Sequence, residues 1–365
     1  MRKWIFVLLV LSACRKSGTD SSSSEATHVT DDTNQSSFYL LNEGNMGLNQ
    51  TSLDEFTGPK GDYHLNIYGE INPTIVKELG DVGNDLKIYG NKLYAVINGS
   101  DRVEVMDKHT AKHLGEISVR SCRYISFYNG KAYVTSFAAA SGSTDGSGFV
   151  AEADTSTFQV TRTVTVGRQP EEMAVAGSKM YVANSGGYTS SNYDRTLSVI
   201  DLNSFTVSKA IDVAVNLHHV KTDGYGNLYV TSRGDYSNIP SKLFIVSTAT
   251  DAVTDSLDLG VSNLAIQGDS AYIISVQWSN TTGANIVSYG IVNVKTKSIV
   301  SNGFIQHQAI TTPYGIAVDP VTRDILVTDV KDYLLPGTLY CFDKTGTKKW
   351  SVTTGNIPSV ITFIQ

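Results

Sequence analysis

Cysteine and proline are scarce in this chain of 365 residues, which contains 3 Cys and 8 Pro. So few cysteines exclude a disulfide framework as the main source of stability. The chain also lacks long stretches with the 3.6-residue periodicity of amphipathic helices. We therefore expect a globular fold that contains almost no helix.

Several signatures of catalysis and nucleic-acid binding are missing as well. The chain has no Gly-rich phosphate loop, no Ser nucleophile elbow and no Cys/His dyad. Its 7 His form no cluster with metal-ligand spacing. The formal net charge of −6, without a basic stripe, disfavours nucleic acid as a partner. These absences predict a protein without enzymatic activity, bound metal or catalytic cofactor.

The first residues have the pattern of a bacterial lipoprotein signal. Arg2 and Lys3 precede an apolar run at residues 4–11 that is too short to span a membrane permanently. Leu11-Ser12-Ala13-Cys14 matches a lipobox, whose cysteine is lipidated and becomes the new N-terminus. We predict a signal peptide at residues 1–13 and lipidation of Cys14. Cleavage would change the net charge from −6 to −8, because Arg2 and Lys3 carry the only charges lost.

The following residues are polar and rich in Ser, Thr and Asp, with almost no large apolar side chains up to residue 36. Such a segment buries too little apolar surface to offset the entropy of ordering it. We therefore expect residues 14–36 to form a lipidated flexible tether and residues 37–365 to form the folded unit.

A strand pattern of aromatic and β-branched residues occurs seven times in that unit. The seven copies are Phe38–Asn42, Leu93–Asn98, Ala132–Ser136, Met180–Asn184, Leu228–Ser232, Ala271–Ser275 and Ile325–Asp329. From Tyr39 to Leu326 the spacings are 55, 39, 48, 48, 43 and 54 residues. A period of this length with only strand chemistry inside it predicts an all-β, seven-bladed β-propeller with four antiparallel strands per blade.

The two ends of the repeat predict how the ring closes. No innermost strand precedes the first copy, whereas residues 358–363 resemble an innermost strand with nothing after it. We expect the C-terminal strand to complete the first blade and so remove edge strands. Cys122 and Cys341 then fall in the third and seventh blades, too far apart for the Cα separation of at most about 7 Å that a disulfide needs. Both thiols are expected to be buried and unpaired.

The functional residues are expected where each innermost strand begins and where each aromatic strand ends, because these points meet on one face. Loop aromatics cluster there in the fourth to seventh blades and indicate ligand contact, whereas the strand tyrosines are expected to pack in the core. The predicted ligand-binding residues are Asn84, Asp85, Arg123, Tyr124, Glu172, Tyr188, His218, Arg233, Tyr236, Trp278, Tyr314 and Tyr333.

Two adjacent pairs could suggest other chemistry. Glu171-Glu172 could serve acid–base catalysis and His218-His219 could bind a metal. Adjacent residues of a strand point to opposite faces, so only one member of each pair is expected to face the channel.

Six runs of residues resemble a known family. They are Asn42-Glu43-Gly44-Asn45-Met46-Gly47, Glu78-Leu79-Gly80-Asp81-Val82-Gly83-Asn84-Asp85, Gln169-Pro170-Glu171-Glu172-Met173, Ala183-Asn184-Ser185-Gly186-Gly187-Tyr188, Ser232-Arg233-Gly234-Asp235-Tyr236 and Lys348-Lys349-Trp350-Ser351-Val352-Thr353-Thr354-Gly355. With the blade spacing from about Phe38 to Phe363, they resemble BtuG, the seven-bladed, YncE-like surface lipoproteins of gut Bacteroidetes.

That resemblance implies a lipid-anchored protein on the outer face of the outer membrane. It further implies that the protein captures cobalamin and passes it to a TonB-dependent cobalamin transporter. The residues alone leave two alternatives open. One is a glycan-binding propeller whose aromatics stack on sugar rings, and the other is a propeller lyase with His218 or Tyr124 as base.

Overall fold

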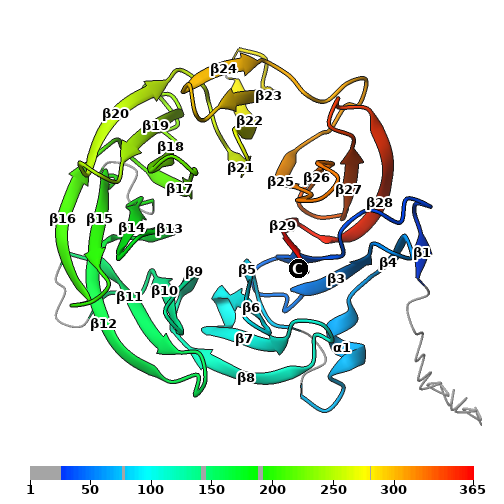
Figure 1. Ribbon diagram of the computed structural model, residues 1–365, viewed down its shortest axis with the longest axis horizontal. Coiled ribbons are helices and arrows are strands. Elements are labelled where there is room, and N and C mark those ends of the chain that lie inside the picture. Colours follow the sequence, from blue (N-terminus) through cyan, green and yellow to red (C-terminus); the bar gives the residue numbers. More distant parts are fainter. Residues whose placement is uncertain (1–25, 76–78, 141–144, 188–191, 280) are drawn as a thin grey trace, which may run out of the picture.

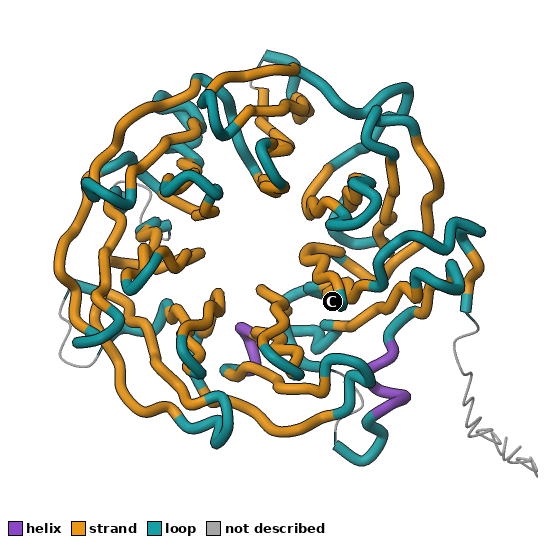
Figure 2. Tube along the Cα trace, in the orientation of Figure 1, coloured by secondary structure: helices purple, strands orange, loops and turns teal. Residues whose placement is uncertain are grey.

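The computed structural model describes residues 26–75, 79–140, 145–187, 192–279 and 281–365. Seven antiparallel sheets form a closed ring, which confirms the predicted seven-bladed propeller (Figure 1). Helix in the described residues is limited to α1 (Ile67–Ile71) and the short 3-10 turn η1 (Asn98–Ser100), drawn in purple in Figure 2.

Each blade contains four strands, which follow one another from the channel outward, and the first sheet has a fifth strand at its outer edge. Blade 1 consists of β29 (Pro358–Phe363), β2 (Phe38–Asn42), β3 (Ser52–Thr57) and β4 (Asp62–His64), and blade 2 of β5 (Gly83–Tyr89), β6 (Lys92–Ile97), β7 (Arg102–Asp107) and β8 (His113–Ser118). Blade 3 consists of β9 (Cys122–Tyr128), β10 (Lys131–Ser136), β11 (Ser147–Asp154) and β12 (Val160–Arg168), and blade 4 of β13 (Pro170–Ala176), β14 (Lys179–Asn184), β15 (Thr196–Asp201) and β16 (Thr206–Asp212). Blade 5 consists of β17 (Leu217–Thr222), β18 (Asn227–Ser232), β19 (Lys242–Ser247) and β20 (Ala252–Leu257). Blade 6 consists of β21 (Asn263–Gln267), β22 (Ser270–Ser279), β23 (Ala284–Asn293) and β24 (Ser298–Ser301), and blade 7 of β25 (Pro313–Val318), β26 (Ile325–Asp329), β27 (Pro336–Phe342) and β28 (Lys348–Asn356).

The seven repeated strand patterns are the second strands of the blades, and both faces of these strands are buried. In β2, Phe38 and Leu40 pack in the cluster shared with blade 7, whereas Tyr39 and Leu41 pack in the cluster shared with blade 2. A strand covered on both faces carries a nearly continuous apolar sequence. The repeat was therefore visible because each second strand lies between two neighbouring blades. Its tyrosines pack as expected, and Tyr272 alone of the six is half-buried.

The C-terminal strand closes the ring as predicted. Strand β29 pairs antiparallel with β2, with Phe38 opposite Phe363 and Asn42 opposite Pro358. The first blade thus combines the two ends of the folded chain. The two remaining cysteines, Cys122 and Cys341, are buried and free, which confirms that prediction as well.

The folded unit begins earlier than the sequence indicated. Strand β1 (Thr27–His28) pairs with β4 as a fifth strand of the first sheet. Gln35 is buried, donates to Asp324 Oδ2 at 2.7 Å and accepts a hydrogen bond from Trp350 Nε1 at 3.0 Å. Residues 27–36 therefore lie on the ring, because strand pairing, hydrogen bonds to buried partners and the packing of Val29 against the core hold them there.

The predicted signal peptide and the lipidated Cys14 lie in residues 1–25, outside the described residues. Within the described part of the chain, no helix is both long and apolar enough to cross a membrane.

The two sides of the ring differ in how the strands are joined. The loop face is the side where innermost strands begin and second strands end, and it includes residues 43–51, 233–241 and 330–335. The opposite side, the turn face, carries short turns that begin with Asp or Asn residues. Asp107 Oδ1, for example, accepts hydrogen bonds from the backbone N–H groups of His109 and Thr110, both at 3.0 Å.

Deleting residues 358–365 should prevent the ring from folding, because β2 would lose its partner and blade 1 its innermost strand. We expect loss of the cooperative thermal transition, measured by circular dichroism. Removing Gln365 alone, which lies beyond β29, is the control and should leave the transition nearly unchanged. A truncated protein that melts like the intact one would refute this account of closure.

Candidate functional site

The innermost strands are irregular where they begin, at the loop face. In six blades the pairing between the innermost and the second strand shifts register near this end, for example between Leu217 and Val220 of β17. A β-bulge of this kind releases consecutive side chains from strict alternation. The Thr231 hydroxyl fixes the bulge by accepting a hydrogen bond from the His219 backbone N–H at 2.9 Å. Bulged strands can therefore send neighbouring side chains toward the same space.

A central cavity of about 650 Å³ runs along the innermost strands, from their starts at residues such as Asn84 and Arg123 to the end of β29 at Phe363. Eight of the predicted ligand-binding residues line it. They are Asn84, Asp85, Arg123, Tyr124, Glu172, His218, Arg233 and Tyr314. The structure therefore brings these eight residues together around one cavity.

Three of the other predicted residues do not line the cavity, since Tyr236 and Tyr333 lie on loops and Trp278 lies near the end of β22. Tyr236, Trp278 and Tyr333 are 72%, 64% and 44% exposed. The ring of Tyr333 lies 6.3 Å from that of Tyr314, so it borders the mouth of the cavity. Tyr188 lies outside the described residues.

Two arginines share one carboxylate at the mouth. Glu171 is buried and accepts hydrogen bonds from Arg123 at 3.1 Å and from Arg233 at 2.9 Å. Burial alone would raise the pKa of Glu171, but the two guanidinium groups lower it below its usual value. Arg123 also lies over the ring of Phe137, with its guanidinium carbon 4.6 Å from the ring centre.

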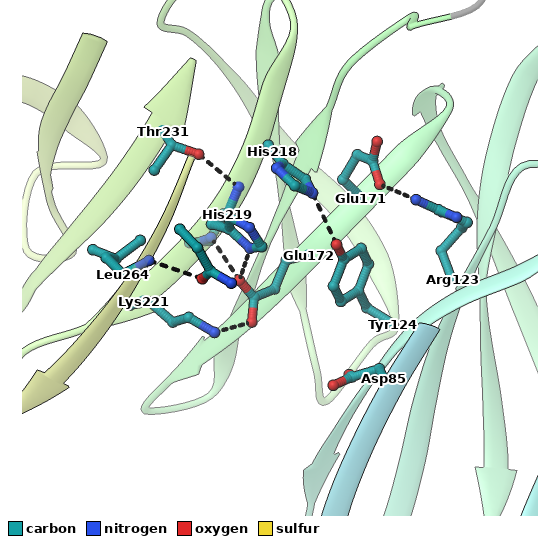
Figure 3. A network of polar contacts seen from close by, with 12 residues as sticks. Asp85, Arg123, Tyr124, Glu171, Glu172, His218, His219, Lys221, Thr231 and Leu264 are labelled. Atoms are coloured by element: carbon teal, nitrogen blue, oxygen red, sulfur yellow. Dashed lines mark hydrogen bonds and ion pairs between the residues drawn. The ribbon is translucent and has the colours of Figure 1, made fainter. Parts of the chain in front are cut away.

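Glu172 lies at the centre of a second charged cluster (Figure 3). Its Oε2 is 2.9 Å from His219 Nδ1, and its Oε1 accepts a hydrogen bond from Lys221 Nζ at 2.5 Å. Lys87 Nζ is 4.0 Å from the same oxygen. Burial opposes ionisation of Glu172, yet Lys221, the hydrogen bond from His219 and Lys87 together lower its pKa.

Tyr124 and His218 form a neutral pair at 2.9 Å between the phenol oxygen and Nε2 (Figure 3). Burial and the nearby carboxylate of Glu171 raise the pKa of Tyr124 well above 10. Burial and the positive charge of Arg233 lower the pKa of His218 well below 6.5. At neutral pH the hydroxyl therefore donates to an uncharged imidazole.

Glu43 is a half-buried carboxyl on the other side of the mouth, directly after β2. Burial raises the pKa of Glu43 to about 7, although Tyr314, Arg123 and Ser359 oppose the shift. This carboxyl therefore changes its charge near neutral pH.

Histidine, cysteine and carboxylate groups do not assemble into a metal site in the described ranges, where no three of them lie close enough to hold an ion. The charged groups of the cavity instead pair with one another.

A family model for a domain of unknown function, DUF5074, matches residues 36–363. The chain belongs to this family. Among curated proteins a sequence search finds no relative.

Solved structures share the fold of this DUF5074 chain at low sequence identity. A quinonprotein alcohol dehydrogenase-like protein from Bacteroides thetaiotaomicron has a TM-score of 0.63 and 13% identity, over 91% of this chain and 78% of that one. Kuenenia stuttgartiensis hydrazine synthase has a TM-score of 0.57 and 17% identity, over 71% of this chain and 76% of that one. The Pan2 WD40 domain of Neurospora crassa has a TM-score of 0.54 and 10% identity, over 76% of this chain and 80% of that one. These likenesses show the propeller fold alone.

One expectation about the DUF5074 site is wrong. His218 and His219 both line the cavity, with ring centres 3.7 Å apart, although neighbouring strand residues were expected to face opposite ways. The bulge at the start of β17 is the reason, since it breaks the alternation there. For the other pair, Glu172 lines the cavity and Glu171 lies behind Arg123 and Arg233.

Sequence reasoning left five residues of the cavity network out of the predicted site, although it considered Glu171 and His219 as members of adjacent pairs. The five are Glu43, Lys87, Glu171, His219 and Lys221. Two features of the sequence could have indicated three of these residues, Glu43, Lys87 and Lys221. Glu43 and Arg233 both follow a second strand and precede a glycine in the left-handed region, Gly44 at φ 71° and Gly234 at φ 69°. Lys87 and Lys221 stand two positions after Asp85 and His219, and therefore on the same strand face.

Glu43→Gln should stabilise the protein more at high pH than at low pH. The folded protein holds the Glu43 proton up to about pH 7, whereas an ordinary glutamate releases it near its usual pKa of 4.5. Glu43 therefore destabilises the folded state increasingly as pH rises between these values. Thermal melts near pH 4 and pH 8 should show a gain of a few degrees for the variant at the higher pH only. The same difference in melting temperature between the variant and the unchanged protein at both pH values would contradict the raised pKa of Glu43.

Proposed function

We propose that this DUF5074 protein binds cobalamin or a related corrinoid on its loop face, as an outer-membrane surface lipoprotein without catalytic activity. In this proposal Cys14 carries the lipid anchor, and a TonB-dependent outer-membrane transporter receives the vitamin. The observation that carries the proposal is the concentration of exposed apolar side chains on one face of the ring, around a cavity that also contains charged groups.

Nine large apolar side chains are exposed on the loops between second and third strands of blades 1, 5, 6 and 7, or on the hairpin ends that bound them. They are Met46, Leu48, Tyr236, Ile239, Trp278, Ile286, Tyr333, Leu334 and Leu335. Among the described residues, the turns of the opposite face carry two, Tyr225 and Val321. Exposed apolar groups gathered in this way are typical of a binding surface.

The chemistry of the face suits a corrinoid. Cobalamin is a wide disk with apolar corrin edges and a fringe of amide side chains. Tyr236, Trp278 and Tyr333 offer flat apolar area, and Asn84, Arg233 and other cavity residues offer hydrogen-bond donors. A closed ring of sheets presents these groups largely preformed, which lowers the ordering cost of binding.

The likeness to BtuG supports the same reading from the sequence. Two of its runs, residues 42–47 and 232–236, form loops at the mouth and contain Glu43 and Arg233. The alternative is a glycan-binding propeller, because exposed aromatics such as Trp278 and Tyr236 can also stack on sugar rings. The lyase alternative would depend on Tyr124 or His218, whose side chains are hydrogen-bonded to each other in the cavity.

Cobalamin should quench the tryptophan fluorescence of the processed protein. After loss of residues 1–13, Trp278 and Trp350 are the tryptophans that remain, and they are 64% and 6% exposed. Cobalamin absorbs strongly, so binding over Trp278 should lower the emission until the site saturates. Unchanged emission at saturating cobalamin, together with no heat in calorimetry, would rule out the proposed function. Heat on adding oligosaccharides instead would favour the glycan alternative.

Trp278→Ala and Tyr236→Ala should each weaken cobalamin binding by roughly ten- to a hundredfold, the usual loss for an exposed aromatic contact. Their melting temperatures should change little, because both side chains are exposed. Tyr225→Ala is the matched control, since Tyr225 is 46% exposed on the turn face. In calorimetry the Tyr225→Ala variant should bind cobalamin as tightly as the unchanged protein does. Equal weakening in all three variants would place the ligand elsewhere.

A further inference from the structure

The two arginines at the mouth stand in front of the carboxylate that they share. Arg123 and Arg233 line the cavity, whereas Glu171 lies behind them and is 3% exposed. Arg123 comes from β9 and Arg233 from the loop after β18, so blades 3 and 5 bring their cations together over blade 4. The surface that the cavity presents here is therefore cationic.

This cluster carries more positive than negative charge. Each guanidinium stays charged at any physiological pH, and one carboxylate balances one of the two. Nε of Arg123 is buried and has no hydrogen-bond partner in the described part of the chain. A partly buried charge of this kind is costly unless a counter-ion or a ligand compensates it.

The neighbouring groups do not supply the missing negative charge. Tyr124 and His218 form a neutral pair beside the arginines. Glu172 is held by Lys221 and lies in the second cluster. The remaining carboxyl facing Arg123 is Glu43, which keeps its proton part of the time at neutral pH because burial raises its pKa to about 7.

We infer that Arg123 and Arg233 form a subsite for an anionic phosphodiester group of the ligand. The inference rests on the proposed function, because it assigns one part of a corrinoid to one part of the loop face. The side chains of cobalamin are neutral amides except for the phosphodiester that links its nucleotide to the ring. Planar guanidinium groups bind phosphate oxygens through paired hydrogen bonds. The apolar loops of blades 1, 5, 6 and 7 would then contact the corrin edge.

Calorimetry with cobalamin and with cobinamide tests this assignment, because cobinamide has the corrin ring but lacks the phosphodiester and the nucleotide. The unchanged protein should bind cobalamin more tightly by roughly ten- to a hundredfold, the effect of a charge-assisted hydrogen bond. Arg233→Gln should bring the two affinities close together, because it should weaken the binding of cobalamin and leave that of cobinamide unchanged. Arg233→Lys should retain part of the difference. Glu171 keeps Arg123 as its partner in both variants, so the fold should persist, which a thermal melt checks.

Arg195→Gln is the matched control, because Arg195 is an exposed loop-face arginine that pairs with Asp212 outside the cavity. It should leave the cobalamin-to-cobinamide ratio unchanged. Equal affinity of the unchanged protein for both corrinoids would overturn the phosphodiester subsite and leave the proposed function intact. The same holds if Arg233→Gln weakens both corrinoids equally. Absence of binding by either corrinoid would overturn the proposed function and the subsite together.

Discussion

Pairing between strands from the two ends of the chain holds the ring closed, and every other feature depends on that closure. Strand β2 hydrogen-bonds to β29 in blade 1, and its two faces pack against blades 7 and 2. Each of the seven apolar clusters joins two neighbouring blades, so no blade completes its core alone. The N-terminal segment strengthens the same junction, where Gln35 bridges Asp324 and Trp350 of blade 7.

The closure of the ring also determines where charged side chains can lie. The innermost strands face a channel that is neither core nor bulk solvent, and their bulged starts place ionisable groups from different blades within reach of one another. Glu171 and Glu172 of blade 4 are the clearest example. Cations from blades 3 and 5 pair with Glu171, and cations from blades 2 and 5 pair with Glu172. Buried charges of this kind stabilise little on balance, but removing one partner leaves the other uncompensated. The network therefore fixes the geometry of the mouth.

The sequence predicted what depends on local pattern and missed what depends on contact between blades. Second strands alternate apolar side chains toward two neighbours, so their seven copies were recognisable one by one. The pairing of Glu172 with His219 joins residues 47 positions apart, and that of Glu171 with Arg233 joins residues 62 apart. No local period encodes such a pair. The bulge at β17 was missed for the same reason, since it needs the partner strand to reveal the extra residue.

A nearly symmetric ring thus presents an asymmetric face. Blades 3, 4 and 5 contribute Arg123, Glu171 and Arg233, whereas exposed apolar groups such as Leu48, Trp278 and Leu334 come from blades 1, 6 and 7. Blade 5 belongs to both regions, because Arg233 and the exposed Tyr236 share one loop. A ligand with one charged and one apolar end can meet both regions at once in a single orientation. This asymmetry of the face supports the proposal of a corrinoid over the alternative of a simple glycan.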